Sequence, residues 1–217
     1  MMRLLLFFYM FLPVLVMAKT DSIATKSFSY YRIGIDLFKP ITGLFQQGNS
    51  SYEMQLDVNY SKSINLVTEL GFGTAKTNND YLNYSSNNTF LRLGIDHPFF
   101  TPDFLGDKDN AFIGLRYALS RVHRNPASIT IYDPLWGPAS SSIGSQNFMA
   151  HWIELTGGFR LEVKKNIFLG WNMRMKSLIN PNSVQKFPPP YLAGYGRGDR
   201  NTQVDFNLYL LYGLGKR

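Results

Sequence analysis

The sequence predicts an all-β fold, an eight-stranded antiparallel up-and-down transmembrane β-barrel. Three observations lead to this prediction. Eight segments alternate apolar and polar side chains, the connections between them are mostly long and short in turn, and the chain begins with an apolar run typical of exported proteins.

The N-terminal run predicts a cleaved secretory signal peptide over residues 1–18. Arg3 supplies a short basic start, an apolar stretch follows, and Ala18 provides the small residue of a cleavage site. A retained anchor helix is the alternative, but the run is short for a span of about 20 residues. We therefore expect residues 19–28 to form a short periplasmic segment and residues 29–217 to form a barrel in a bacterial outer membrane.

The composition fits a barrel better than a bundle of membrane helices. Hydrophobic residues make up 45% of the chain, charged residues 17% and aromatic residues 15%. Alternating strands produce such a mixture and long apolar helices do not. The chain has no cysteine, which excludes disulfides, thiolate chemistry and a lipoprotein anchor. The formal net charge of +7 favours outer-membrane lipid and lipopolysaccharide phosphates as partners over nucleic acid, which exported proteins seldom meet.

The clearest strand segment runs from Tyr52 to Tyr60. Its even-numbered residues are apolar or aromatic, and its odd-numbered residues are polar. A helix would scatter both sets around its axis, whereas a strand places them on opposite faces. The eight segments of this kind are residues 31–37, 52–60, 65–72, 91–96, 113–120, 153–162, 169–176 and 203–212.

The connections support an outer-membrane barrel, in which short periplasmic turns alternate with long outer loops. The second and third segments, and the sixth and seventh, are joined by short turns, whereas most other connections are long. The stretch from His97 to Asn110 is the exception, because it lies on the predicted periplasmic side and yet is long.

Alternation alone does not say which face lies inside. A soluble lipocalin-like barrel or a β-sandwich would bury the apolar face. Glycines on the polar face, aromatic residues near the strand ends and the length of the segments favour a membrane barrel with its polar face inside.

An eight-stranded barrel has room for its own side chains and little else. Buried charges are tolerable when they are paired, so we expect an interior plugged by ion pairs rather than a water-filled pore. Two similar segments, Tyr31–Asp36 and Leu91–Asp96, each place an arginine and an aspartate four residues apart on the polar face. We interpret these pairs as structural rather than as an ion relay. The predicted network comprises Arg32, Asp36, Glu53, Asp57, Glu69, Arg92, Asp96, Arg116, Glu154, Arg160, Glu162, Arg174 and Asp205.

No catalytic residue, metal site or cofactor is expected. The three histidines lack the spacing of metal ligands, and no glycine-rich phosphate loop is present. A catalytic group can be drawn from His123 or His151 with Asp133 and a serine of residues 140–142, but no spacing signature supports it.

Recognition is expected in the connecting segments, where prolines and aromatic residues make stiff contact surfaces. The candidate residues for docking a protein partner are Trp136, Phe187, Tyr191, Phe99, Phe100 and Phe104. Two alternatives are an ordinary loop surface and the binding of lipopolysaccharide phosphates by Arg121, Arg124, Arg197 and Arg200.

Three stretches carry a resemblance to a known group: YYRIGIDLFKP, FLRLGIDHPFF and the C-terminal FNLYLLYGLGKR. With the signal peptide, they make nearly the whole mature chain resemble the small outer-membrane β-barrels of Bacteroidota. The resemblance implies a non-enzymatic structural or accessory subunit of a larger outer-membrane assembly, with the barrel-assembly machinery as a candidate. A narrow pore and a lipid-modifying enzyme are the alternatives. The chain departs from the usual pattern of these barrels, because it continues past the aromatic Tyr212.

Overall fold

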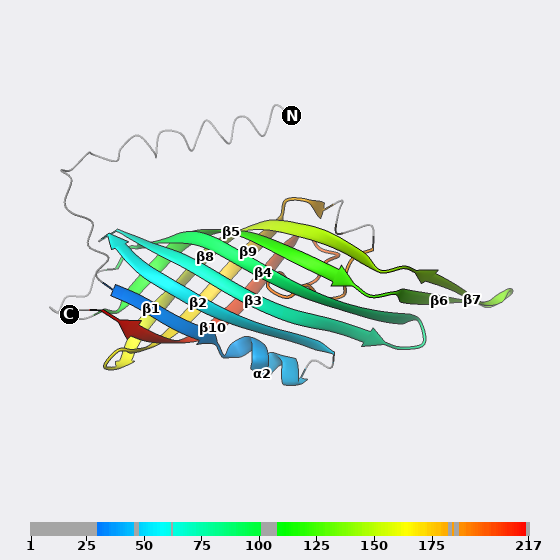
Figure 1. Cartoon of the computed structure of the whole chain (residues 1–217), viewed down its shortest axis with the longest axis horizontal. Coiled ribbons are helices and arrows are strands. Elements are labelled where there is room, and N and C mark those ends of the chain that lie inside the picture. The colour runs from blue at the N-terminus through cyan, green and yellow to red at the C-terminus, as the bar shows by residue number, and fades with distance from the viewer. Residues whose placement is uncertain are drawn as a thin grey trace, which may run out of the picture.

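The computed structural model describes residues 30–45, 48–61, 63–100, 108–181, 184 and 187–215. The predicted signal peptide and residues 19–28 lie outside this part of the chain. The described residues form a closed eight-stranded antiparallel barrel, which confirms the predicted fold class (Figure 1).

All eight predicted segments are barrel strands, and the strands run in chain order around the wall. The pairing of β3 with β4 closes the ring. The barrel strands are β1 (Tyr30–Asp36), β2 (Asn49–Ser61), β3 (Ile64–Asn78), β4 (Leu82–Pro98), β5 (Asn110–Arg124), β8 (Gln146–Lys164), β9 (Ile167–Leu178) and β10 (Thr202–Leu214).

Several strands are longer than the alternation predicted. β4 has 17 residues and β8 has 19, because the parts of these strands nearest the hairpin end of the barrel continue in register although their outward side chains are mostly polar. The expected long connection between β3 and β4 is therefore mostly strand. The paired residues Asn78 and Asn83 flank its turn at residues 79–82.

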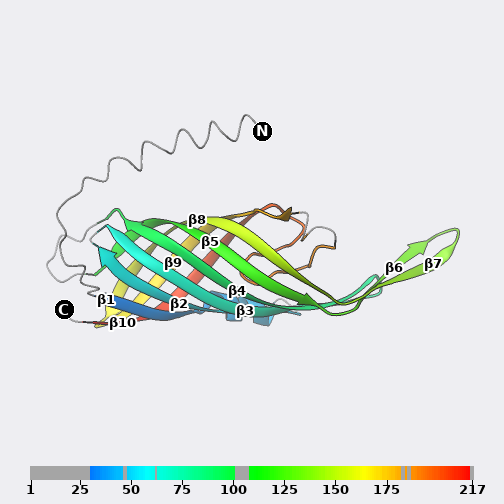
Figure 2. The same cartoon turned by 45° about the horizontal axis from the view of Figure 1, so that its top comes forward.

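The connection between β5 and β8 contains a second element that was expected to be loop. β6 (Ala127–Asp133) and β7 (Gly137–Ile143) form a hairpin. It pairs with the barrel at the start of β4, where Leu82 faces Ile129. Both ribbon views show this hairpin projecting beyond the barrel at the end opposite the C-terminus (Figures 1 and 2).

The wall is interrupted beside β1, which has only 7 residues. β2 and β10 continue past the end of β1 without a strand between them. Helix α2 (Phe38–Phe45) lies there, with Gly43 close to the backbone of Asn49 and Ser50. One missing strand leaves a gap of about 10 Å between its neighbours, which is about the diameter of a helix. α2 thus takes the place that a longer β1 would occupy beyond Asp36, between β2 and β10. Within the described residues, no helix is long and apolar enough to cross a membrane.

The structure assigns the two faces of the wall. Inward-pointing side chains are mainly charged or polar and buried, whereas every barrel strand carries large apolar side chains that are exposed on the outer face. Glycines relieve crowding inside. A Cβ on Gly71 would lie 2.2 Å from the ring of Phe90, so the narrow interior admits the ring only because Gly71 has no side chain.

Closure of the ring predicts a disulfide between the first and last barrel strands. Ile33 and Tyr212 are Cα partners on the outer face of β1 and β10. Antiparallel partners lie about 4.5–5.5 Å apart, within the Cα range of disulfides. The Ile33→Cys/Tyr212→Cys variant should therefore oxidise to a cross-linked form that migrates faster in a denaturing gel. The chain has no native cysteine to interfere.

The control is Ile33→Cys/Val204→Cys, in which the second position lies on β10 but about 25 Å farther along the strand. Equal cross-linking of both variants would contradict the closed barrel.

Candidate functional site

The barrel interior is filled in three layers. At the end near the C-terminus lie Phe168, Tyr209 and Leu211, with Tyr30 against them. Charged side chains fill the middle. At the opposite end the barrel strands and a folded-back connection form an apolar cluster around Trp152. The charges are thus enclosed between apolar layers, where unpaired charges are strongly disfavoured.

Glu69 on β3 is the centre of the charged layer and is fully buried. Its carboxylate receives two parallel hydrogen bonds from Arg174 on β9, of 2.7 and 2.9 Å, and one of 2.8 Å from Arg92 on β4. Arg116 on β5 lies 3.5 Å away. One carboxylate therefore connects strands on opposite sides of the ring.

Two further carboxylates bind Arg92. Glu53 accepts hydrogen bonds of 2.9 and 3.3 Å from the guanidinium and one of 3.0 Å from the Tyr209 hydroxyl. Glu154 lies 2.9 Å from Arg92 Nε and accepts a hydrogen bond of 2.6 Å from the Trp152 indole. The apolar layers are thus tied to the charges by the polar atoms of Trp152 and Tyr209.

A second group of ion pairs lies nearer the C-terminal end. Asp96 binds Arg116 at 2.5 Å and also Arg160. Asp57 lies 3.0 Å from both Arg160 and Arg32. Each aspartate therefore lies between two cations.

The remaining network residues differ in their contacts. Asp36 accepts a hydrogen bond of 2.6 Å from Asn207 rather than from an arginine. Asp205 binds Lys176 at 2.5 Å and also Lys39 of α2. Glu162 lies apart from the charged layer, at the end of β8, where its carboxylate accepts the backbone N–H of Asn166 in the turn. The predicted place of Glu162 in the network is thus not what the structure shows, since its register partner on β9 is Phe168 of the apolar layer, beyond the charged one.

The folded-back connection, residues 187–200, forms a plug segment. Asn88 of β4 clamps it, because its amide donates to Ala193 O at 2.9 Å and accepts from Ala193 N at 3.0 Å. Arg92 and Lys176 both donate to the carbonyl of Gly194, at 2.6 and 2.7 Å. Gly194 has φ +83° and lies against the ring of Phe90, so the segment needs glycine here. Sequence reasoning treated this glycine-rich stretch as an outer loop and missed the plug.

Two predicted docking residues belong to the plug segment and are turned inward. Phe187 packs near Tyr84 and lies under the guanidinium of Arg124, 4.9 Å from the ring centroid. Tyr191 packs against the apolar cluster around Trp152. Neither is an exposed docking residue, because the segment folds back into the barrel instead of extending outward.

The other predicted docking residues are exposed where the structure describes them. Trp136 is 88% exposed at the tip of the β6–β7 hairpin, beside Leu135 at 89%. Phe99 and Phe100 are exposed at the other end of the barrel. Phe104 lies outside the described residues.

The histidines do not form the catalytic group considered from sequence. His123 Nδ1 lies 2.8 Å from the Asn147 side-chain oxygen, and His151 Nδ1 lies 2.6 Å from the Tyr117 hydroxyl. Asp133 caps the hairpin turn by accepting the backbone N–H groups of residues 135 and 136. In the described part of the chain, no group of three or more metal-ligating side chains is close enough to hold an ion.

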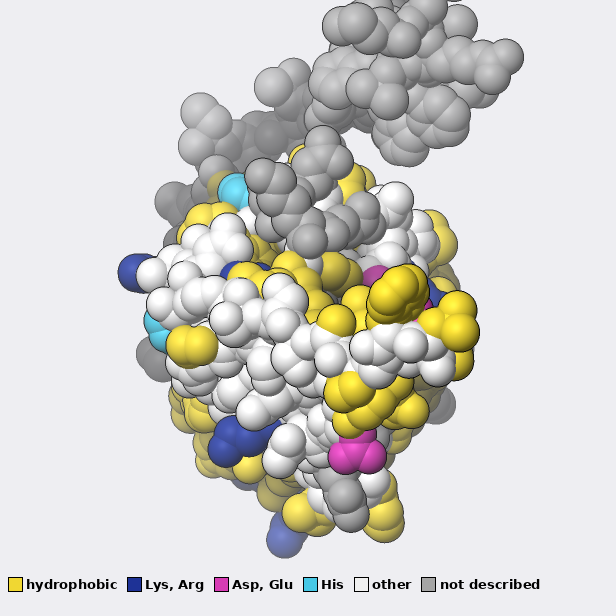
Figure 3. Space-filling model, turned by 90° about the vertical axis from the view of Figure 1, so that its right-hand side faces the viewer, with side chains coloured by type: hydrophobic (Ala, Val, Ile, Leu, Met, Phe, Trp, Pro, Cys, Tyr) yellow, Lys and Arg dark blue, Asp and Glu magenta, His cyan; other side chains and the backbone are white. Residues whose placement is uncertain are grey.

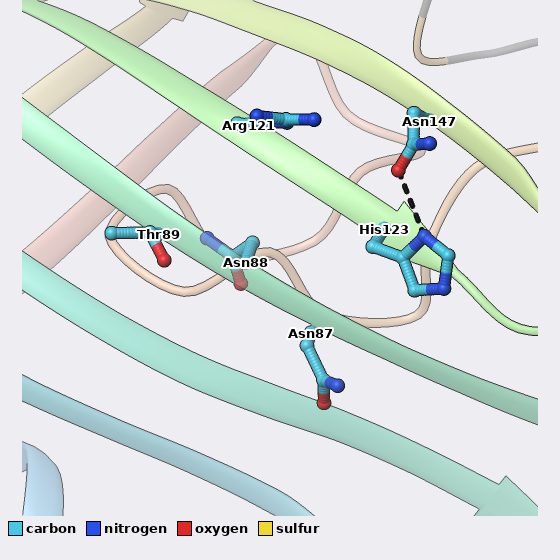
Figure 4. A pocket seen from close by; sticks show the side chains of 6 residues that line it. All are labelled: Asn87, Asn88, Thr89, Arg121, His123 and Asn147. Carbon is cyan, nitrogen blue, oxygen red and sulfur yellow. Dashed lines mark hydrogen bonds between the residues drawn. The ribbon is translucent and has the colours of Figure 1, made fainter.

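A polar pocket lies on the outer face of β4, β5 and β8. It is an open hollow of about 400 Å³ rather than an enclosed cavity. Its lining residues are Asn87, Asn88, Thr89, Arg121, His123 and Asn147 (Figure 4).

Two exposed arginines near the end of the barrel that carries the β6–β7 hairpin differ in their partners. Arg197 forms two hydrogen bonds with Asp199, of 3.0 and 2.7 Å, which lower the pKa of the Asp199 carboxyl. Among the described residues, Arg121 has no hydrogen-bond or ion-pair partner.

The chain belongs to the family described as Domain of unknown function (DUF6048), whose model matches residues 1–215. No protein of curated function matches it. Solved structures similar to it include Neisserial surface protein A, at 10% identity over 89% of this chain and 100% of that chain (TM-score 0.47). Two others are Ail, the attachment invasion locus protein of Yersinia pestis (6% identity, 87% and 100%, TM-score 0.46), and a major outer membrane protein from Thermus thermophilus (11% identity, 86% and 99%, TM-score 0.47).

Removal of the central carboxylate should destabilise the barrel strongly. Glu69→Ala leaves Arg92, Arg174 and Arg116 buried with one partner fewer. Loss of one partner from a buried ion pair costs about 3–5 kcal/mol. Urea unfolding of the protein in lipid vesicles should show a loss of this size.

Glu162→Ala is the matched control, because it removes a glutamate of the same barrel that lies outside the charged layer. It should cost about 1 kcal/mol, the value of a single hydrogen bond. Equal losses in the two variants would refute the central role of Glu69.

Removal of the clamp should release the plug segment. Asn88→Ala deletes both hydrogen bonds to Ala193. Trypsin should then cleave after Arg197 and Arg200 about tenfold faster, since two buried hydrogen bonds no longer oppose local opening. The control is Asn87→Ala, the outward-facing neighbour. An unchanged cleavage rate in Asn88→Ala would mean that other contacts hold the segment.

Proposed function

We propose that the protein is a non-enzymatic integral barrel of a bacterial outer membrane that serves as an accessory subunit of a larger outer-membrane assembly, with the β6–β7 hairpin as its partner contact. The observation that carries the proposal is the combination of a filled interior with an aromatic hairpin tip exposed outside the barrel.

The outer wall supports membrane insertion. Exposed apolar side chains occur on every barrel strand, among them Ile33 on β1, Leu115 on β5 and Met175 on β9. Soluble monomers rarely expose apolar patches larger than a few hundred Å². A wall that is apolar outside and charged inside is the arrangement that lipid requires, because a closed barrel also leaves no strand edge unpaired in the hydrocarbon.

The filled interior argues against a pore. The ion pairs around Glu69 cross the lumen, and the plug segment covers them at one end. Conduction would require these contacts to break together. The proposed activity is therefore placed on surfaces outside the lumen.

The hairpin has the properties of a contact element. Trp136 and Leu135 are its most exposed apolar residues, and tryptophan is enriched among residues that dominate interface energies. Near the tip, Tyr132 of β6 packs edge to face against Tyr81 of the β3–β4 turn, with ring centroids 5.6 Å apart, which supports this part of the hairpin. The end of the barrel from which the hairpin projects shows few charged side chains (Figure 3), which suits a protein partner better than a highly charged ligand.

The identity of the assembly follows the resemblance noted in the sequence, which makes the barrel-assembly machinery the first candidate. The histidines support the non-enzymatic part of the proposal. Each of His123 and His151 contacts an amide or a phenol rather than a nucleophile.

Truncation of the hairpin tip should abolish partner binding. The Leu135→Ala/Trp136→Ala variant removes the exposed apolar tip, while the barrel, which these residues do not contact, should fold normally. Affinity purification from native outer membranes in mild detergent should recover a stoichiometric outer-membrane partner with the wild type and about tenfold less with the variant.

The matched control is Leu44→Ala/Phe45→Ala, an adjacent apolar pair of α2 that is 83% and 82% exposed. It should keep the partner. A wild-type protein that runs alone in every mild detergent, or equal losses in both variants, would refute the accessory role.

A further inference from the structure

We propose that the polar pocket on β4, β5 and β8 binds the phosphate of an outer-leaflet lipid head group, with Arg121 as the main ligand-binding residue. The inference rests on the proposed membrane location and adds to it a defined binding site and a ligand class.

The strand register places the pocket at the border of the apolar wall. Leu91 and Leu119 are partners in one row of β4 and β5. In the next row outward Thr89 faces Arg121, and in the row after that Asn87 faces His123. On these strands the outward side chains thus change from apolar to polar within one step of two residues, about 7 Å.

The length of this step, about 7 Å, is similar to the thickness of the head-group layer of a bilayer. The head-group layer adds about 5–7 Å on each side of the hydrocarbon core. Arg121 directly follows Leu119, the last apolar outward residue of β5, although its row continues to exposed apolar side chains on the neighbouring strands, Met149 on β8 and Phe72 on β3. Its guanidinium therefore lies at the edge of the apolar wall, within reach of lipid phosphates once that wall is in the hydrocarbon. Its methylene stem remains against the apolar side, as is usual for arginine at such borders.

The lining has the chemistry of an anion site. Arg121 supplies an unpaired planar fork of N–H donors, which matches phosphate oxygens in pairs. Thr89 and Asn87 add a hydroxyl and an amide on the neighbouring strand (Figure 4). No carboxylate lines the pocket, so nothing there competes for the guanidinium or repels a phosphate.

The pocket is also pre-arranged. His123 and Asn147 are joined across β5 and β8 by their 2.8 Å contact, which fixes one wall. Asn88 closes the pocket from behind, where it is held by Ser120 and the plug segment. Three strands of the wall therefore set the positions of the polar groups, and the side chains of His123, Asn147 and Asn88 lose little freedom on binding.

A pair of lipids that differ only in the phosphate tests the site. The folded protein in phosphate-free maltoside detergent is titrated with phosphatidic acid and with diacylglycerol of the same acyl chains, and bound lipid is counted by native mass spectrometry. The wild type should retain phosphatidic acid and not diacylglycerol. Arg121→Gln should bind phosphatidic acid about tenfold more weakly, as expected for the loss of charge-assisted hydrogen bonds.

Two further variants sharpen the test. Arg121→Lys keeps the charge without the fork and should fall between the wild type and Arg121→Gln. Arg200→Gln removes a charge from an exposed arginine outside the pocket and should bind as the wild type does.

Three results would overturn the proposal: equal affinity of Arg121→Gln and the wild type, equal retention of diacylglycerol, or displacement of the lipid by millimolar inorganic phosphate, which would point to a free anion as the ligand. Heat-modifiable gel mobility of the wild type in vesicles reports insertion separately. A barrel that inserts but shows no effect of Arg121 refutes this site alone, whereas one that does not insert refutes the membrane location as well.

Discussion

The pairing of opposite charges across the barrel lumen is the interaction on which the rest of the structure depends. Glu69 joins Arg92, Arg116 and Arg174 from three other strands. These charges are enclosed between apolar layers, so each needs its partners. Their pairing fills the middle of the lumen, and it also provides the anchor for the plug segment through Arg92 and Gly194. The surfaces that remain for recognition are consequently the outer wall and the projecting hairpin.

Alternation was sufficient to predict the barrel strands but not their ends. Alternation arises because the outer face of a strand is apolar and the inner face is polar. It disappears where a strand continues beyond the apolar wall and both of its faces are polar. Ser85 to Asn88 are polar on both faces, and yet they remain paired in β4. The serines of β7 are also polar on both faces of their strand, so alternation did not reveal that strand either. The plug segment was not predicted for another reason: it is held by contacts distant in sequence, above all those of Asn88 with Ala193.

The composition of the charged layer was largely anticipated, whereas its pairs were not. Arg32 and Asp36 face the lumen on the same strand, but four residues of strand separate them by about 13 Å. Register partners on adjacent strands are about 5 Å apart. Arg32 therefore pairs with Asp57 of β2, its register partner. The choice of partner depends on register and barrel stagger, which a single sequence does not display.

Because β1 is short, the number of register pairs between neighbouring strands varies around the wall. β1 has six register partners on β10, whereas β5 has fifteen on β8. β1 and β10 are also the first and last barrel strands in the chain, so their pairing joins the two ends of the barrel sequence. β1 has only six register partners on β2 as well, so the wall is expected to open first under lateral tension at the two junctions of β1. The α2 helix beside β1 then stabilises this part of the wall, and the ion pair between Lys39 and Asp205 attaches the helix to β10.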